Sequence, residues 1–97
     1  MKPITVLGAA NAELVEAAEY YESRSANLGV RFLAEVESAL GAIATGPARA
    51  SLIRNSIRRR LLPQFPYAIL YRDDPNEIVV IAIMHLHRRP GYWAERF

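Results

Sequence analysis

The side chains best suited to chemistry are arginines and histidines in the second half of the chain. Three consecutive arginines occupy positions 58–60. A later segment contains two histidines, two more arginines and two aromatic residues: His85, His87, Arg88, Arg89, Tyr92 and Trp93. The planar guanidinium of arginine binds phosphates and carboxylates in a bidentate manner, and neighbouring aromatic rings allow base stacking. The pattern therefore indicates a surface for an anionic partner. The alternative is a solvated arginine rim, with Tyr92 and Trp93 packed as a C-terminal lid.

His85 is a candidate general acid or base, since the pKa of histidine lies near neutrality. Metal-free cleavage of RNA also needs a phosphate clamp, which Arg58 and Arg60 could supply. It needs a second proton-transfer group as well, and the nearest acids lie in a predicted turn or close to the terminus. A structural histidine that caps a strand is the alternative. His85 and His87 share a strand face, but no third ligand has zinc-site spacing, so we expect neither a metal nor a cofactor.

The charge is distributed unevenly along the 97 residues. Residues 1–48 carry three basic and six acidic side chains, a net charge of −3, whereas residues 49–97 carry nine arginines and four acids, a net charge of +5. Hydrophobic residues make up 52% of the chain and charged residues 23%, which predicts one folded domain over residues 1–97. The chain contains no cysteine, so disulfides and thiol catalysis are excluded.

Two helices are predicted after a short β-favouring run at residues 4–7. In the first helix, Asn11 is the expected N-cap. The apolar stripe consists of Leu14, Ala17, Ala18 and Tyr21, and the opposite arc consists of Glu13, Glu16, Glu19 and Glu22. Val15 and Tyr20 lie among these glutamates as exposed apolar groups that could seat a partner. The second helix has a predicted core stripe of Phe32, Leu33, Val36, Leu40 and Ile43, and Gly46-Pro47 ends it.

Three strands are predicted beyond Pro47, at residues 57–62, 67–72 and 78–84, with short links that favour an antiparallel meander. The order β-α-α-β-β-β predicts an α+β fold, a largely antiparallel sheet with a helical hairpin packed on one face. We expect the uncovered sheet face to gather Arg58, Arg60, Tyr71 and His85, with Arg88 or Arg89 nearby. Arg59 shares a strand face with Ile57 and Leu61, so either this strand starts late or Arg59 lies at a frayed edge.

No apolar run approaches the ~18 residues of a membrane helix, and the first residues do not have the pattern of a secretory signal. We therefore expect a cytoplasmic protein that does not enter the membrane.

Several blocks, spread over nearly the whole chain, resemble the RelE/ParE toxin superfamily, in particular its plasmid stabilization branch. They are Tyr20-Tyr21-Glu22, Leu28-Gly29-Val30-Arg31-Phe32-Leu33, Arg59-Arg60-Leu61-Leu62, Phe65-Pro66-Tyr67, Leu70-Tyr71-Arg72, and His85 with Arg88-Arg89-Pro90-Gly91-Tyr92-Trp93. The resemblance implies the toxin of a type II toxin–antitoxin pair, held inactive by a cognate antitoxin. We expect the antitoxin to dock on Val15, Tyr20, Arg58 and Arg60, and Arg89 and Trp93 to contact the target or a nucleic acid.

Within the superfamily, RelE-like members cut messenger RNA on the ribosome and ParE-like members inhibit DNA gyrase. RelE-like enzymes commonly place lysines in the active groove, whereas Lys2 is the only lysine here. Other nuclease members use a glutamate on the first meander strand, which here carries arginines. Both departures favour the ParE-like function. RNA cleavage is the alternative, with Arg58, Arg60, His85, Arg88 and Tyr92 as its catalytic residues, and a non-toxic nucleic-acid-binding module is a third hypothesis.

Overall fold

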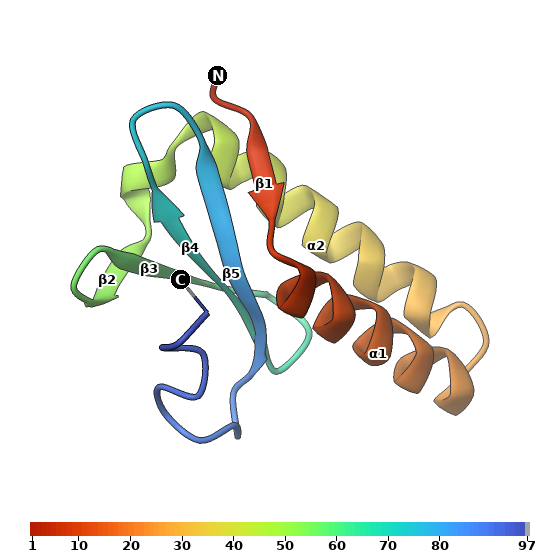
Figure 1. Ribbon diagram of the computed structural model, residues 1–97. Helices are drawn as coiled ribbons and strands as arrows, with labels where there is room; N and C mark the ends of the chain where they lie inside the picture. Colours follow the sequence, from red (N-terminus) through yellow and green to blue (C-terminus); the bar gives the residue numbers. More distant parts are fainter. Residues whose placement is uncertain (97) are drawn as a thin grey trace.

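The computed structural model describes residues 1–96, which form two α-helices, a short 3₁₀ helix and five strands (Figure 1). In chain order these are β1 (Ile4–Val6), α1 (Gly8–Arg24), α2 (Leu28–Thr45), η1 (Pro47–Arg49), β2 (Ser51–Arg54), β3 (Ile57–Leu61), β4 (Tyr67–Asp73) and β5 (Ile78–His85). The sheet has the order β1-β5-β4-β3-β2, and β1 pairs with β5 in parallel while the other pairs are antiparallel. The α+β prediction is confirmed, with the helical hairpin on one face of the sheet.

Strand β2 is the element that the sequence did not predict. All four of its residues are exposed, so they lack the alternation of buried and exposed side chains by which strands are recognised. A tight turn joins β2 to β3, and in it Asn55 has a positive φ of 50°. Asparagine tolerates this left-handed conformation better than most residues. The strand therefore forms by pairing with β3 rather than by burying an apolar face.

Helix α1 begins at Gly8, three residues before the predicted N-cap Asn11, which is a correction. Leu7 is the N-cap and has extended backbone. Its N–H donates to the carbonyl of Val80 at 3.1 Å, and its own carbonyl accepts from the N–H of Asn11 at 2.9 Å. The start of the helix is therefore fixed by the pairing of β1 with β5, a tertiary contact, and not by a capping side chain.

The core on the helix side of the sheet contains the stripes of both helices. Ala17, Phe32, Val36 and Ile43 are buried there, together with Ile69 and Tyr71 of β4 and Val80 of β5. Four aromatic rings pack together with centroid distances of 4.9 to 6.2 Å, mostly edge to face: Tyr21, Phe32, Phe65 and Tyr67. Leu33 was predicted to belong to this core, but it is 42% exposed. It lies one position past Phe32 and so points to the outside of the hairpin.

Part of the opposite face of the sheet is covered by the C-terminal segment (blue in Figure 1). The ring of Trp93 is 4% exposed and packs in a second apolar cluster with Ile57, Leu70, Val79 and Ile81. The packing of Trp93 agrees with the alternative in which the C-terminal aromatic residues form a lid, and the contact of Trp93 with a target stays a prediction. Within the described residues, no helix is long and apolar enough to cross a membrane.

Gly29 lies at a close contact between the two helices, and we predict that Gly29→Ala destabilises the fold. A Cβ atom at this position would clash with the carbonyl oxygen of Ala18 and would lie 2.9 Å from the Cβ of Glu22. The expected loss in the free energy of unfolding is about 1–3 kcal/mol, as for other overpacked sites. Gly41→Ala is the matched control, since nothing lies within 4 Å of a Cβ there, and it should stabilise helix α2 by about 0.5–1 kcal/mol. Urea unfolding of both variants measures this; equal effects would contradict it.

Candidate functional site

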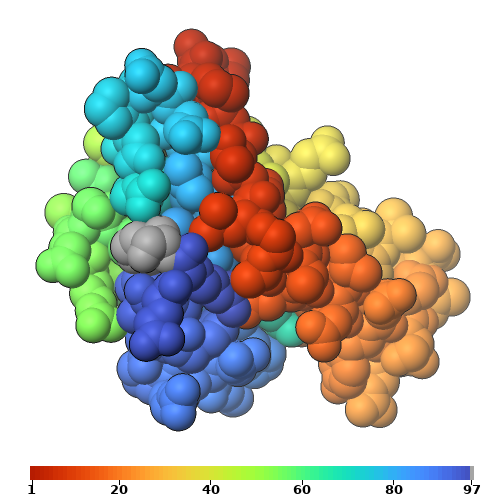
Figure 2. Space-filling view, in the orientation of Figure 1, coloured from red at the N-terminus to blue at the C-terminus, as the bar shows by residue number. Residues whose placement is uncertain are grey.

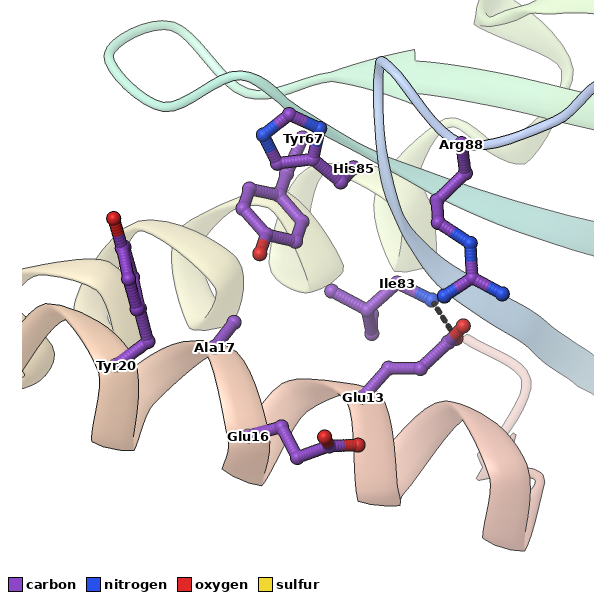
Figure 3. Close-up of a pocket in the computed structure, with 8 residues that line it drawn as sticks. All are labelled: Glu13, Glu16, Ala17, Tyr20, Tyr67, Ile83, His85 and Arg88. Atoms are coloured by element: carbon purple, nitrogen blue, oxygen red, sulfur yellow. Dashed lines mark hydrogen bonds between the residues drawn. The ribbon is translucent and has the colours of Figure 1, made fainter.

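A cavity of about 240 Å³ opens between α1 and the ends of β4 and β5. Figure 3 shows its lining, which includes two carboxylates, a histidine, an arginine and two tyrosines: Glu13, Glu16, Ala17, Tyr20, Tyr67, Ile83, His85 and Arg88. The four residues from α1 follow the spacing i, i+3, i+4 and i+7, which places them on one face of the helix. The cavity therefore combines the C-terminal candidates His85 and Arg88 with groups from the first helix.

Glu13 contradicts its assignment to the solvent-exposed arc, because its side chain is only 14% exposed and points toward the sheet. Its Oε1 accepts from the N–H of Ile83 at 3.0 Å, and its Oε2 accepts from the hydroxyl of Tyr92 at 2.6 Å. The guanidinium of Arg96 donates to both carboxylate oxygens, at 2.8 and 3.0 Å. Burial, together with the hydrogen bond to Glu13, raises the pKa of Tyr92 well above its ordinary value, so this hydroxyl stays a donor.

The physical reason for this arrangement is the short β1 strand. It pairs with β5 at residues 78–80, so within residues 1–96 the following part of that edge of β5 has no neighbouring strand. Glu13 accepts from the backbone N–H of Ile83, and Arg96 donates to the carbonyl of Ile81 at 3.1 Å. Buried backbone groups must be paired, so these two side chains take the place of a neighbouring strand. They also fasten the C-terminal segment to α1.

We predict that Glu13→Gln lowers the free energy of unfolding by about 2–4 kcal/mol, because it removes the charged partner of Arg96 from a largely buried network. Glu16→Gln is the matched control: the residue lines the same cavity, is exposed and should change stability by no more than about 0.5 kcal/mol. Chemical denaturation measures both variants. A Glu13→Gln protein as stable as the control would contradict the role of Glu13 as the fastening group.

His85 lies at the end of β5 with its ring against that of Tyr67, at a centroid distance of 5.0 Å. Its Nδ1 accepts from the backbone N–H of His87 at 3.0 Å, so in the neutral ring the proton is on Nε2. Glu16 lines the same cavity as His85 and carries a carboxylate able to transfer a proton, a candidate that the sequence analysis did not include. The helical spacing of Glu13, Glu16 and Tyr20 is the signal that could have found it.

Arg58 and Arg60 do not lie in this cavity, and the expectation that the uncovered sheet face gathers them with Tyr71 is wrong. Both point to the helix side of the sheet, on the same face as their cross-strand partners Tyr71 and Ile69 of β4. Arg58 donates to the carbonyl of Ala50 at 2.7 Å, and Arg60 lines a separate small cavity beside α2. Tyr71 is fully buried, and its hydroxyl donates to the carbonyl of Pro47.

The position of Arg59 on the same strand face as Ile57 follows from the alternation of side chains along β3. Ile57 and Arg59 share the helix-free face, and no late start of the strand is needed. Ile57 is buried beneath the C-terminal segment, Arg59 is exposed, and Leu61 is 54% exposed at the end of β3. An arginine can follow a core residue on this face because the C-terminal segment covers only part of it.

The remaining candidates lie on exposed parts of the molecule. Val15 is 46% and Tyr20 51% exposed on α1, and the guanidinium of Arg24 lies over the ring of Tyr20 at 4.9 Å. Arg89 is exposed, and Arg88 stacks on the ring of Tyr92 at 4.0 Å. In the part of the chain that the structure describes, no group of three or more His, Asp or Glu side chains is arranged to hold a metal ion.

The sequence matches a family model described as the ParE toxin of the type II toxin–antitoxin system parDE, over residues 4–90. The fold is similar to a solved structure from a chromosomal ParDE toxin–antitoxin system of P. aeruginosa, with a TM-score of 0.79 and 13% sequence identity. This likeness covers 90% of the present chain and 98% of the other. A search of curated proteins found no match.

Proposed function

Because this chain belongs to the ParE toxin family of type II toxin–antitoxin systems, we propose that it stops cell growth by inhibiting DNA gyrase and that a cognate antitoxin neutralises it. The family match over residues 4–90 is the observation that carries this proposal. Gyrase acts on the chromosome, so the proposed site of action is the cytoplasm.

The geometry around His85 supports gyrase inhibition over RNA cleavage. A nuclease site needs cations around the scissile phosphate, yet Arg58 and Arg60 lie on β3 away from the cavity that contains His85. That cavity holds Arg88 together with Glu13 and Glu16. Glu13 is paired with Arg96, but Glu16 forms no ion pair within residues 1–96, and its charge would repel a phosphate.

The antitoxin is proposed to bind on the helix side of the molecule. Val15 and Tyr20 are exposed apolar groups on α1, and Arg58 and Arg60 project from the same side of the sheet at β3. An amphipathic segment along α1 that continues into an acidic stretch near β3 would satisfy both patches.

Ribosome-dependent RNA cleavage is the second candidate, because one observation favours it. His85, Glu16, Tyr67 and Arg88 line a single cavity, so two groups able to transfer protons and one cation are close together. In that case His85→Ala should abolish cleavage. If the His85→Ala protein cleaved RNA as fast as the wild type, this cavity would be excluded as a nuclease site.

The experiment that separates the two functions is induction of the toxin with two parallel readouts, a DNA-damage reporter and the integrity of messenger RNA. We expect the DNA-damage response to rise while messenger RNA stays intact over the first minutes. Rapid loss of messenger RNA without DNA damage would contradict gyrase inhibition. His85→Ala is included as a variant and should remain toxic if gyrase is the target.

A further inference from the structure

A second cavity, of about 380 Å³, lies on the helix-free face of the sheet, beside the C-terminal segment. Figure 2 shows this segment (blue) between the β2–β3 region (green) and the start of α1 (red to orange). The apolar part of the lining comes from β2, β5 and the C-terminal segment: Ile53, Met84, Leu86, Pro90 and Trp93. The charged part consists of three arginines, Arg54, Arg59 and Arg88, and no carboxylate lines this cavity among residues 1–96.

These three arginines are not neutralised within the described residues. None of them lies within ion-pair distance of a carboxylate in the range 1–96. Arg54 and Arg88 instead lie over the rings of Trp93 and Tyr92, at 5.8 and 4.0 Å. A guanidinium that stacks on an aromatic ring is held in place and can still form hydrogen bonds at its edge.

Gly91 lies in the C-terminal segment next to the end of the Arg54 side chain. Gly91 has a positive φ of 76°, and the Nη1 atom of Arg54 would lie 2.9 Å from a Cβ atom at this position. Only glycine adopts this conformation without strain and also leaves this space empty. Gly91 therefore leaves room for the guanidinium of Arg54 beside the cavity.

The lining indicates a protein segment rather than a nucleic acid. A phosphate backbone gains nothing from Ile53, Met84 and Leu86, whereas exposed apolar side chains mixed with arginine and methionine are typical of protein interfaces. Leu86 is 42% and Ile53 37% exposed. Strand β2 also lies at the end of the sheet with all four residues exposed, so an extended segment can run alongside it.

We propose that this cavity receives an extended acidic segment of the toxin's target enzyme, with an apolar side chain against Met84 and carboxylates on Arg54, Arg59 and Arg88. This inference rests on the proposed function. The proposed antitoxin surface lies on the opposite side of the sheet and combines the exposed apolar groups Val15 and Tyr20 with Arg58 and Arg60. The two surfaces differ in position, so two different partners can bind them.

Charge reversal at Arg59 tests the proposal, since this side chain is exposed and forms no ion pair within residues 1–96. Arg31→Glu is the matched control, an equal charge change at an exposed position of α2. We expect Arg59→Glu to raise the toxin concentration needed for half-inhibition of gyrase by about tenfold or more, because a like charge faces the acidic segment. The affinity for the antitoxin should stay within about twofold, and Arg31→Glu should inhibit like the wild type.

The outcomes that overturn the proposal are distinct. If Arg59→Glu still inhibits gyrase, with or without loss of antitoxin affinity, the target enzyme does not bind in this cavity. Binding of duplex DNA by the wild type that is lost in Arg59→Glu would identify a nucleic acid as the occupant. If the wild type itself leaves gyrase unaffected, the proposed function fails first, and the inference fails with it.

Discussion

Induction of this chain in cells that lack its antitoxin is expected to stop growth and to lower viable counts by orders of magnitude. The chain belongs to a family of toxins, and a free toxin that blocks gyrase stops replication. Co-expression of the cognate antitoxin should restore growth, because binding neutralises the toxin by mass action. Colony counts after induction, with and without the antitoxin gene, measure the effect.

A folded but harmless protein would contradict this result. The comparison is therefore made at equal levels of soluble protein, checked by circular dichroism of the purified chain. Normal growth with soluble, folded protein would support the third hypothesis, a non-toxic binding module.

Phe32→Ala is expected to lower the free energy of unfolding by about 3–5 kcal/mol, the usual cost of removing a buried phenylalanine ring. Phe32 is fully buried, and its ring contacts those of Tyr21, Phe65 and Tyr67 at centroid distances of 5.1 to 5.3 Å. A small domain has roughly 5–15 kcal/mol of stability in total. The substitution should therefore unfold a substantial fraction of the protein and weaken its toxicity in cells.

The control is the adjacent residue, Leu33→Ala. Leu33 is 42% exposed on the outside of the hairpin, so its truncation should cost about 1 kcal/mol or less. Urea unfolding of the two variants separates them. If both lost the same stability, the aromatic cluster would not be the centre of the helix-side core.

The elements that bury an apolar face could be predicted from the sequence. Residues 78–83 form an unbroken apolar run and are all buried in β5, and Gly46-Pro47 ends α2 as expected. Strand β2 was missed because its residues bury nothing. The start of α1 was missed because it depends on the hydrogen bond between Leu7 and Val80, a contact between residues far apart in the sequence.

The candidate site was predicted only in part, for a related reason. Strand parity correctly placed Arg58 and Arg60 on one face and Ile57 with Arg59 on the other. Parity does not indicate which face the helices cover, and Tyr71 proved to lie beneath them. Glu13 was assigned to the solvent by its helical position, because nothing in the local pattern shows that Arg96 returns to meet it.

DNA supercoiling by purified gyrase in the presence of the purified chain is the decisive measurement for the proposed function. We expect supercoiling to fall as toxin is added, the cognate antitoxin to restore it, and Arg59→Glu to inhibit far less than Arg31→Glu. Unchanged supercoiling at toxin concentrations that saturate the antitoxin would show that gyrase is not the target.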